Sequence, residues 1–176
     1  MIETLTEELA GVRYRELREV TSAALSNPVM QALLANWEAL RGAAELPRKD
    51  AFDPLDLPQA LGRMMVLERL ADGDYLYRLY GVKTTEASGF DLTGKRLRAA
   101  LGEAAPFFEA KYDLCLERRQ PLYTLHCPVK VPSVVLLERL MLPFADRDGD
   151  PRFVVVYLMP RAMSDVPKPQ MGSRMG

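Results

Sequence analysis

Two arginines stand inside otherwise apolar stretches of this sequence, where a charged side chain needs a partner. Arg78 lies within YLYRLY, and Arg139 lies within LLERLML. Arginine is seldom fully buried alone, so one interpretation pairs the two at the surface with Glu68 or Glu138. The alternative is that one guanidinium points into the interior and holds a carboxylate- or phosphate-bearing ligand through two parallel hydrogen bonds.

Aromatic side chains could complete an apolar pocket around such an arginine, with tyrosine hydroxyls as its polar groups. Phe108 and Tyr112 lie four residues apart, on one face of an expected helix. The same spacing is also what a helix facing the core requires. The candidate ligand-binding residues are therefore Arg78, Tyr80, Phe108, Tyr112, Arg139 and Tyr157.

The single histidine, His126, limits the catalytic and metal chemistry available to the chain. One histidine cannot build a multi-histidine zinc site, and no G-x-S-x-G nucleophile motif occurs. We therefore predict no catalytic residue, no metal site and no enzyme activity. Alternation puts His126 on the less apolar face of its strand, with Leu122 and Thr124, which favours a surface or hydrogen-bonded side chain. Cys115 and Cys127 are expected to be small buried side chains without a redox role.

The glycine-bracketed segment GFDLTGKRL, residues 89–97, has some features of a phosphate-binding loop. Such a loop would need a serine or threonine directly after its lysine, but Lys95 is followed by another basic residue. We predict that Gly89 and Gly94 supply backbone conformations that a β-carbon resists, and that Asp91 caps the following turn. The segment is thus interpreted as a structural connection.

Composition and charge exclude several classes of protein. The chain has 176 residues, of which 48% are hydrophobic and 27% charged, with a formal net charge of −1. This balance argues against nucleic acid and anionic membranes as partners. No apolar run approaches the roughly 20 residues that span a bilayer, and the acidic start is unlike a secretory signal. A cytoplasmic location is expected.

The hydrophobic periodicity of residues 1–45 predicts a helical arm. Its two helices would cover residues 4–25 and 28–41, with a stop and restart at Ser26-Asn27-Pro28. Trp37, on the second helix, is expected to pack on the open face of a sheet. The first helix would either pair with its copy in a homodimer or fold back on its own domain, and these alternatives stay open.

Residues 46–160 predict an α+β domain. Short helices and a longer helix over residues 103–119 follow the first two strand-like runs, and Asp-Gly pairs mark two hairpin turns. This order predicts a five-stranded antiparallel sheet with helices on one face. The tail, residues 161–176, is expected to be disordered. The five strand-like runs are residues 64–70, 74–81, 122–131, 134–144 and 152–160.

With this order of elements the chain resembles the PAS fold, in which two strands, a helical segment and a three-stranded meander follow one another. It is similar in particular to a family of small alphaproteobacterial proteins in which a PAS domain is nearly the whole chain. That resemblance implies a fold more than an activity. The pieces that carry it are WEALRG, LPRKDAFDPLDLP, YRLYG, GFDLTGKRL and ERLMLPFADRDGD, between Trp37 and Pro160.

The resemblance implies a role in sensing or signalling, with a small-molecule ligand between sheet and helices and a signalling protein as partner. Haem is not supported, because PAS sensors place the haem histidine on the long helix and residues 103–119 contain none. Flavin is not supported either, because the N-C-R-F-L-like stretch of flavin photoreceptors is absent. The alternatives are a ligand-free dimerisation or interaction module and, third, an enzyme on the same scaffold.

Overall fold

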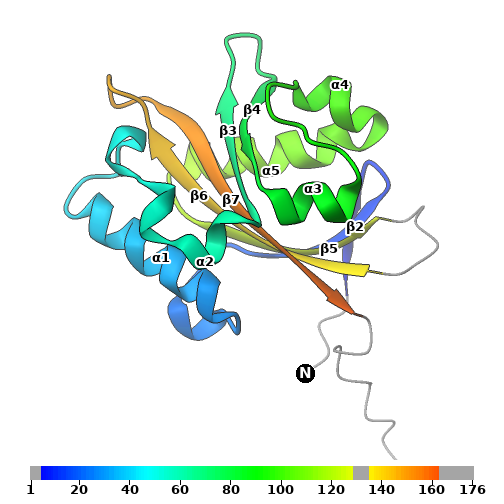
Figure 1. Cartoon of the computed structure of the whole chain (residues 1–176), viewed down its shortest axis with the longest axis horizontal. Coiled ribbons are helices and arrows are strands. Elements are labelled where there is room, and N and C mark those ends of the chain that lie inside the picture. The colour runs from blue at the N-terminus through cyan, green and yellow to red at the C-terminus, as the bar shows by residue number, and fades with distance from the viewer. Residues whose placement is uncertain (1–4, 129–134, 163–176) are drawn as a thin grey trace, which may run out of the picture.

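One antiparallel sheet separates two layers of helices in the computed structural model of this chain, which describes residues 5–128 and 135–162 (Figure 1). The seven strands follow the order β1-β2-β5-β6-β7-β3-β4. Their bounds are β1 (Glu7–Leu9), β2 (Val12–Leu17), β3 (Met64–Arg69), β4 (Tyr75–Tyr80), β5 (Leu122–Pro128), β6 (Val135–Ala145) and β7 (Pro151–Ala162).

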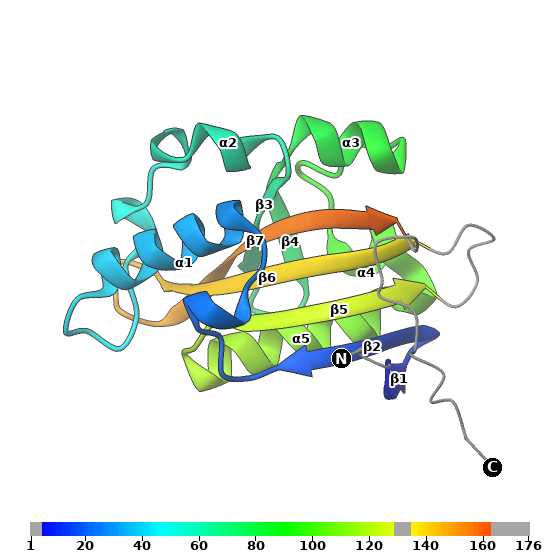
Figure 2. The same cartoon turned by 90° about the horizontal axis from the view of Figure 1, so that it is seen from below.

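The two faces of the sheet carry different helices (Figure 2). Helices α1 and α2 pack on one face, and α4 and α5 pack on the other. The α-helices are α1 (Pro28–Arg41), α2 (Pro58–Leu61), α3 (Val82–Ser88), α4 (Leu97–Leu101) and α5 (Ala105–Arg118). Single 3-10 turns are η1 (Ser22–Ala24), η2 (Lys49–Ala51), η3 (Pro54–Asp56) and η4 (Gly102–Ala104).

Alternation along the strands divides the hydrophobic core into two parts. On β6, for example, Leu140 and Leu142 face α1, whereas Met141 faces α5. On the α1 side, the Trp37 indole N–H donates a buried hydrogen bond of 2.7 Å to the carbonyl oxygen of Pro143. The expected packing of Trp37 on this face of the sheet is therefore confirmed.

Local sequence signals set the start of α1 and the hairpin turns as predicted. Asn27 caps α1, because its Oδ1 accepts hydrogen bonds from the backbone N–H groups of Val29 and Met30 at 2.8 and 3.3 Å. The two Asp-Gly turns, between β3 and β4 and between β6 and β7, contain Gly73 and Gly149 at φ values of 84° and 91°. Both angles lie in the region that glycine adopts most easily.

The predicted first helix is wrong, and so is the predicted count of five strands. The residues from Glu7 to Leu17 form the hairpin β1–β2, which adds two strands to the sheet. Ala10 and Gly11 make its two-residue turn with φ values of 50° and 74°, as twisted hairpins require. A homodimer contact through this helix, as predicted, is therefore not possible, because these residues form strands. Residue 4, its predicted start, lies outside the described residues.

The added strand β2 pairs along β5 and turns it into an interior strand, with Tyr14 opposite His126. An ion pair fixes β2 to α5, because Lys111 Nζ lies 2.5 Å from Glu16 Oε2. Their side chains are only 8% and 4% exposed. The ammonium group also lies 4.0 Å from the centroid of the Tyr14 ring, a favourable cation–π distance. Helix α5 and the hairpin are therefore one packed unit.

The segment from Gly89 to Leu97 is a structural connection, as predicted. Gly89 and Gly94 have φ values of 81° and 77°, and Asp91 Oδ1 accepts a hydrogen bond of 2.9 Å from the backbone N–H of Thr93. The chain then runs along β4, where the N–H of Gly94 donates to the Tyr77 carbonyl at 2.8 Å. The segment thus covers the outer edge of β4.

Two predictions fall largely outside the described residues. The predicted turn at residues 132–133 lies outside the described residues, and so do residues 163–176 of the predicted disordered tail. Arg161 and Ala162 are the last residues of β7.

Glu16→Gln tests whether the ion pair holds the hairpin to α5. Because the change leaves Lys111 buried without its counter-charge, we expect the free energy of unfolding to fall by about 3 kcal/mol. Urea unfolding followed by circular dichroism measures this loss. Glu8→Gln, on the exposed strand β1, is the control and should change stability by less than about 0.5 kcal/mol. Equal losses in both variants would contradict the role given to the pair.

Candidate functional site

Three polar side chains lie on the face of the sheet that α5 covers. Arg139 comes from β6, while Thr124 and His126 come from β5, and the strand register sets Thr124 directly opposite Arg139. Because side chains two residues apart on a strand share a face, His126 lies beside Thr124. Arg139 is 6% exposed, and the other two are fully buried. We call these three residues the polar cluster.

Helix α5 covers the polar cluster with aromatic rings. The guanidinium carbon of Arg139 lies 4.6 Å from the Phe108 ring centroid, and its Nη1 donates a hydrogen bond to the Tyr112 hydroxyl. The His126 ring lies 5.6 Å from the Phe107 ring and 5.9 Å from the Phe108 ring. The arginine is therefore held by cation–π contacts and one phenol rather than by a carboxylate.

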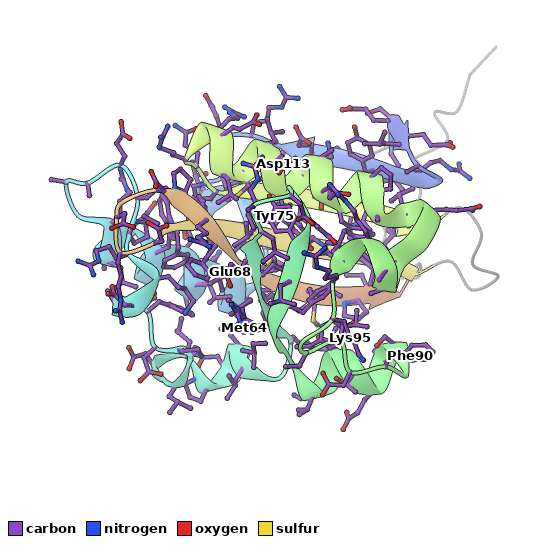
Figure 3. The ribbon with its side chains drawn as sticks, turned by 90° about the horizontal axis from the view of Figure 1, so that it is seen from above. Met64, Glu68, Tyr75, Phe90, Lys95 and Asp113 are labelled. Atoms are coloured by element: carbon purple, nitrogen blue, oxygen red, sulfur yellow. The ribbon has the colours of Figure 1, made fainter. Side chains whose placement is uncertain are left out.

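Strand β4 contributes further tyrosines to this face. Tyr77 is 3% exposed, and its ring lies 5.4 Å from the ring of Tyr80. Tyr75 reaches α5, where its hydroxyl donates a hydrogen bond of 2.7 Å to Asp113 Oδ1 (Figure 3). This bond fixes the middle of α5 over the sheet, and so fixes the rings that cover the polar cluster.

Several polar atoms of the cluster have no hydrogen-bond partner within the described part of the chain. They are Nδ1 and Nε2 of His126, Oγ1 of Thr124 and Nε of Arg139, and all are buried. A buried polar group that stays unpaired costs about 1–3 kcal/mol. Buried polar groups in native proteins nearly always have a partner, so these four atoms make the polar cluster the candidate site for a polar group of a ligand.

The electrostatics of the cluster follow from burial around one fixed positive charge. Desolvation, and then the charge of Arg139, lower the pKa of His126 well below its ordinary value, so the imidazole is neutral at neutral pH. Desolvation raises the pKa values of Tyr77 and Tyr112 against the opposing effect of Arg139. Arg139 makes no ion pair with any described residue, so the cluster favours an anionic or strongly accepting group.

Three of the predicted site residues meet in this place, and a fourth lies near it. Arg139 contacts both Phe108 and Tyr112. Tyr80 packs against the same part of the core and contacts Tyr77, while its hydroxyl lies 3.4 Å from Ser88 Oγ.

The other two predicted residues do not join them. The Arg78 side chain is 55% exposed and pairs with Glu68, as the surface interpretation expects. Tyr157 packs in the core on the α1 side of the sheet. The sheet therefore separates Tyr157 from Arg139.

Sequence reasoning missed His126, Thr124 and Tyr77 as site residues. The expected shared face of His126, Thr124 and Leu122 is correct, but His126 is not at the surface and has no hydrogen bond to any described residue. The error arises because α5 covers that face of β5 and β2 pairs along its edge. The signal that could have found the site is the register of β5 against β6, which sets Thr124 opposite Arg139.

The cysteines and carboxylates form no second reactive centre within the described residues. Cys115 is buried, its thiol donates to the carbonyl oxygens of Gln120 and Met141 at 3.5 and 3.7 Å, and burial raises its pKa. Cys127 packs on the α1 side, so the sheet lies between the two sulfur atoms. No described group of three or more His, Cys, Asp or Glu residues could hold a metal ion. No helix in this part of the chain is long and apolar enough to cross a bilayer.

Comparisons with known proteins bear on the whole fold. Residues 25–158 match the family described as PAS domain. Among solved structures, a sensory box sensor histidine kinase from Vibrio cholerae aligns with 62% of this chain and 92% of its own, at 15% identity and a TM-score of 0.46. No curated protein matches the sequence.

The burial of the only histidine predicts a stability that falls with acid. Because the folded state holds His126 neutral while the unfolded state protonates it below about pH 6.5, the unfolded chain binds more protons there. The contribution of neutral His126 to the free energy of unfolding is therefore fully present above that pH and decreases below it. We expect the free energy of unfolding to fall by about 1.4 kcal/mol between about pH 7.5 and about pH 5.5.

Urea unfolding at several pH values measures this dependence. His126→Asn is the matched variant, since it keeps a polar side chain but does not titrate in this range. Its stability should be independent of pH over the same interval. A variant curve as steep as that of the wild type would refute the assignment to His126.

Proposed function

This chain belongs to the PAS domain family, and from that membership we propose that it is a sensory and signalling module. It binds a small molecule at the polar cluster, and this binding changes its contact with a protein partner. The observation that carries this proposal is the buried Arg139, which has no carboxylate partner and whose Nε lacks an acceptor among the described residues. Fold membership alone does not fix a ligand, so the chemistry of the cluster has to suggest one.

The cluster suits a small organic anion with a carboxylate group. Arg139 supplies the charge and an unused N–H donor, and the neutral imidazole of His126 supplies one donor and one acceptor. The hydroxyl of Thr124 can serve in either role. A charge-assisted hydrogen bond from a buried guanidinium is among the strongest that a site can offer. Phe108 and Tyr112 would contact the apolar part of the ligand.

Access to the cluster depends on Phe108, which is only partly buried and lies over Arg139. A ligand that approached the guanidinium would therefore replace the ring of Phe108. The preceding residue, Phe107, is fully buried and contacts His126 at 5.6 Å and Tyr14 of β2 at 5.1 Å. A displacement of α5 at Phe108 would thus act on β2 through Phe107.

The β1–β2 hairpin is then the output surface, in place of the helical arm that the sequence suggested. Strand β1 is exposed at every residue. The hairpin contacts α5 through the Lys111–Glu16 pair as well as through Phe107. A ligand shifts this unit only if it binds two positions of α5 with different affinity. A second copy of the chain or a signalling protein would respond to that shift.

Arg139→Gln tests the proposal directly. Native mass spectrometry of freshly purified protein measures any small molecule that leaves on denaturation, and thermal shift with acetate, succinate, citrate and benzoate measures binding in solution. We expect the wild type to bind one of these carboxylates and Arg139→Gln to bind it at least about tenfold more weakly, because a charged hydrogen bond is lost.

Arg78→Gln is the matched control, since Arg78 is also a strand arginine but is exposed and pairs with Glu68. It should bind the carboxylate as the wild type does. A wild type that carries no small molecule and responds to no carboxylate would favour the ligand-free interaction module. If Arg78→Gln and Arg139→Gln weakened carboxylate binding equally, the proposal that Arg139 binds the ligand would be wrong.

A further inference from the structure

A cleft of about 580 Å³ opens where the ends of α1 and α5 meet the segment between β2 and η1. Figure 2 shows both helix ends on the same side of the molecule. Residues 18–21 form one wall, residues 118–121 form another, and the last turn of α1 with Glu45 completes the lining. The cleft shares no residue with the polar cluster around Arg139, so its role is independent of the proposed function.

The lining is positive although the whole chain is slightly negative. Four arginines and two glutamates give the lining a net charge of +2, against −1 for the chain. One of the four, Arg18, also pairs with Glu16 outside the lining, at 2.5 Å. Such a concentration of charge in a concave site attracts anions. We call this site the arginine cleft, after the four arginines that line it. They are Arg18, Arg41, Arg118 and Arg119.

The back of the arginine cleft is rigid. The Arg41 guanidinium carbon lies 5.3 Å from the Trp37 ring centroid, and the indole is itself fixed by its hydrogen bond to the Pro143 carbonyl. The Nε of Arg41 is buried and has no hydrogen-bond partner among the described residues. The guanidinium of Arg41 is therefore held in a fixed orientation at the back of the cleft, with its Nε buried.

Two further arginines come from the end of α5. Arg118 makes no ion pair with any residue that the structure describes. Arg119 pairs with Glu45 at 3.3 Å, but that carboxylate is 83% exposed, and exposed pairs contribute little stability. A bound anion can therefore replace Glu45 as the partner of Arg119 with little loss of stability.

The backbone at Arg119 is unusual for an arginine. Its φ of 51° puts it in the left-handed region, where it ends α5. Glycine is the residue that this position favours, because a β-carbon raises its free energy. The side chain at Arg119 is thus present at a conformational cost, which is typical of positions that serve a site.

From these observations we infer that the arginine cleft binds a small organic dianion, through a phosphate group or two carboxylates. Guanidinium groups match both oxyanions through paired N–H donors. Neutralising the negative ends of α1 and α5 accounts for one cation at each helix end. It does not account for four arginines around one cleft, two of which, Arg18 and Arg119, pair with Glu16 and Glu45.

Isothermal titration calorimetry at constant ionic strength tests this inference, with inorganic pyrophosphate and succinate as separate probes. The fluorescence of Trp37, the only tryptophan, reports binding in the cleft itself. We expect saturable binding by the wild type, and the tighter probe identifies phosphate or carboxylate as the preferred group. Arg118→Gln and Arg119→Gly should bind at least about tenfold more weakly.

Arg119→Gly also separates binding from folding, because glycine suits the left-handed backbone and should melt no lower than the wild type. Arg147→Gln is the control, since Arg147 is 86% exposed and lies outside the cleft. It should bind as the wild type does. The inference is overturned if the wild type binds neither probe, or if Arg118→Gln binds as tightly as the wild type.

Discussion

The buried pair of Lys111 and Glu16 is the interaction on which the arrangement of this molecule depends. Lys111 could not leave water without Glu16, because an isolated buried charge is far more costly than a paired one. Glu16 also pairs with the more exposed Arg18 at 2.5 Å. The contact of Lys111 with Glu16 at 2.5 Å holds β2 against α5. In that position β2 pairs along the edge of β5 while α5 covers its face, and His126 has no contact with solvent. The charge pair borders the polar cluster directly, because the strand register sets Glu16 opposite Thr124.

The buried carboxylates on one face of the sheet are paired, whereas a buried arginine on the other has no ion pair with a described residue. Helix α1 also has two buried polar atoms without a partner among the described residues, Asn36 Oδ1 and Arg41 Nε. On the α1 side, Glu68 is paired with Arg78 and Arg152. Glu138 on the same side accepts a hydrogen bond of 2.8 Å from the Tyr123 hydroxyl. The charges there stabilise the fold and are satisfied. On the α5 side, four polar atoms of three residues remain without partners in the described structure.

Much of the fold could be predicted from the sequence, because its signals are local. The cap at Asn27, the Asp-Gly turns and the spacing of Phe108 and Tyr112 each involve a few neighbouring residues. The N-terminal hairpin could not be found this way, because it depends on pairing with β5, more than 100 residues away along the chain.

The candidate site was only partly predictable for the same reason. Arg139 stood out as a charge in an apolar run, but nothing local assigned Arg78 and Tyr157 to the opposite face. A register shift at Val66/Leu67 also changes the alternation of β4 against β3, and a change of one residue moves every side chain to the other face.

The covered edge of β4 has a consequence for how this molecule meets others. The strand's outer backbone groups are already bonded to the chain near Gly94 and Lys95, and at the other end of the sheet β1 is only three residues long, with Glu7 and Glu8 among them. Short, charged or covered edges resist the addition of a further strand. Open-ended growth of sheets from molecule to molecule is thereby disfavoured. A partner has to recognise side chains, whose identity can encode specificity, rather than bare backbone, which cannot.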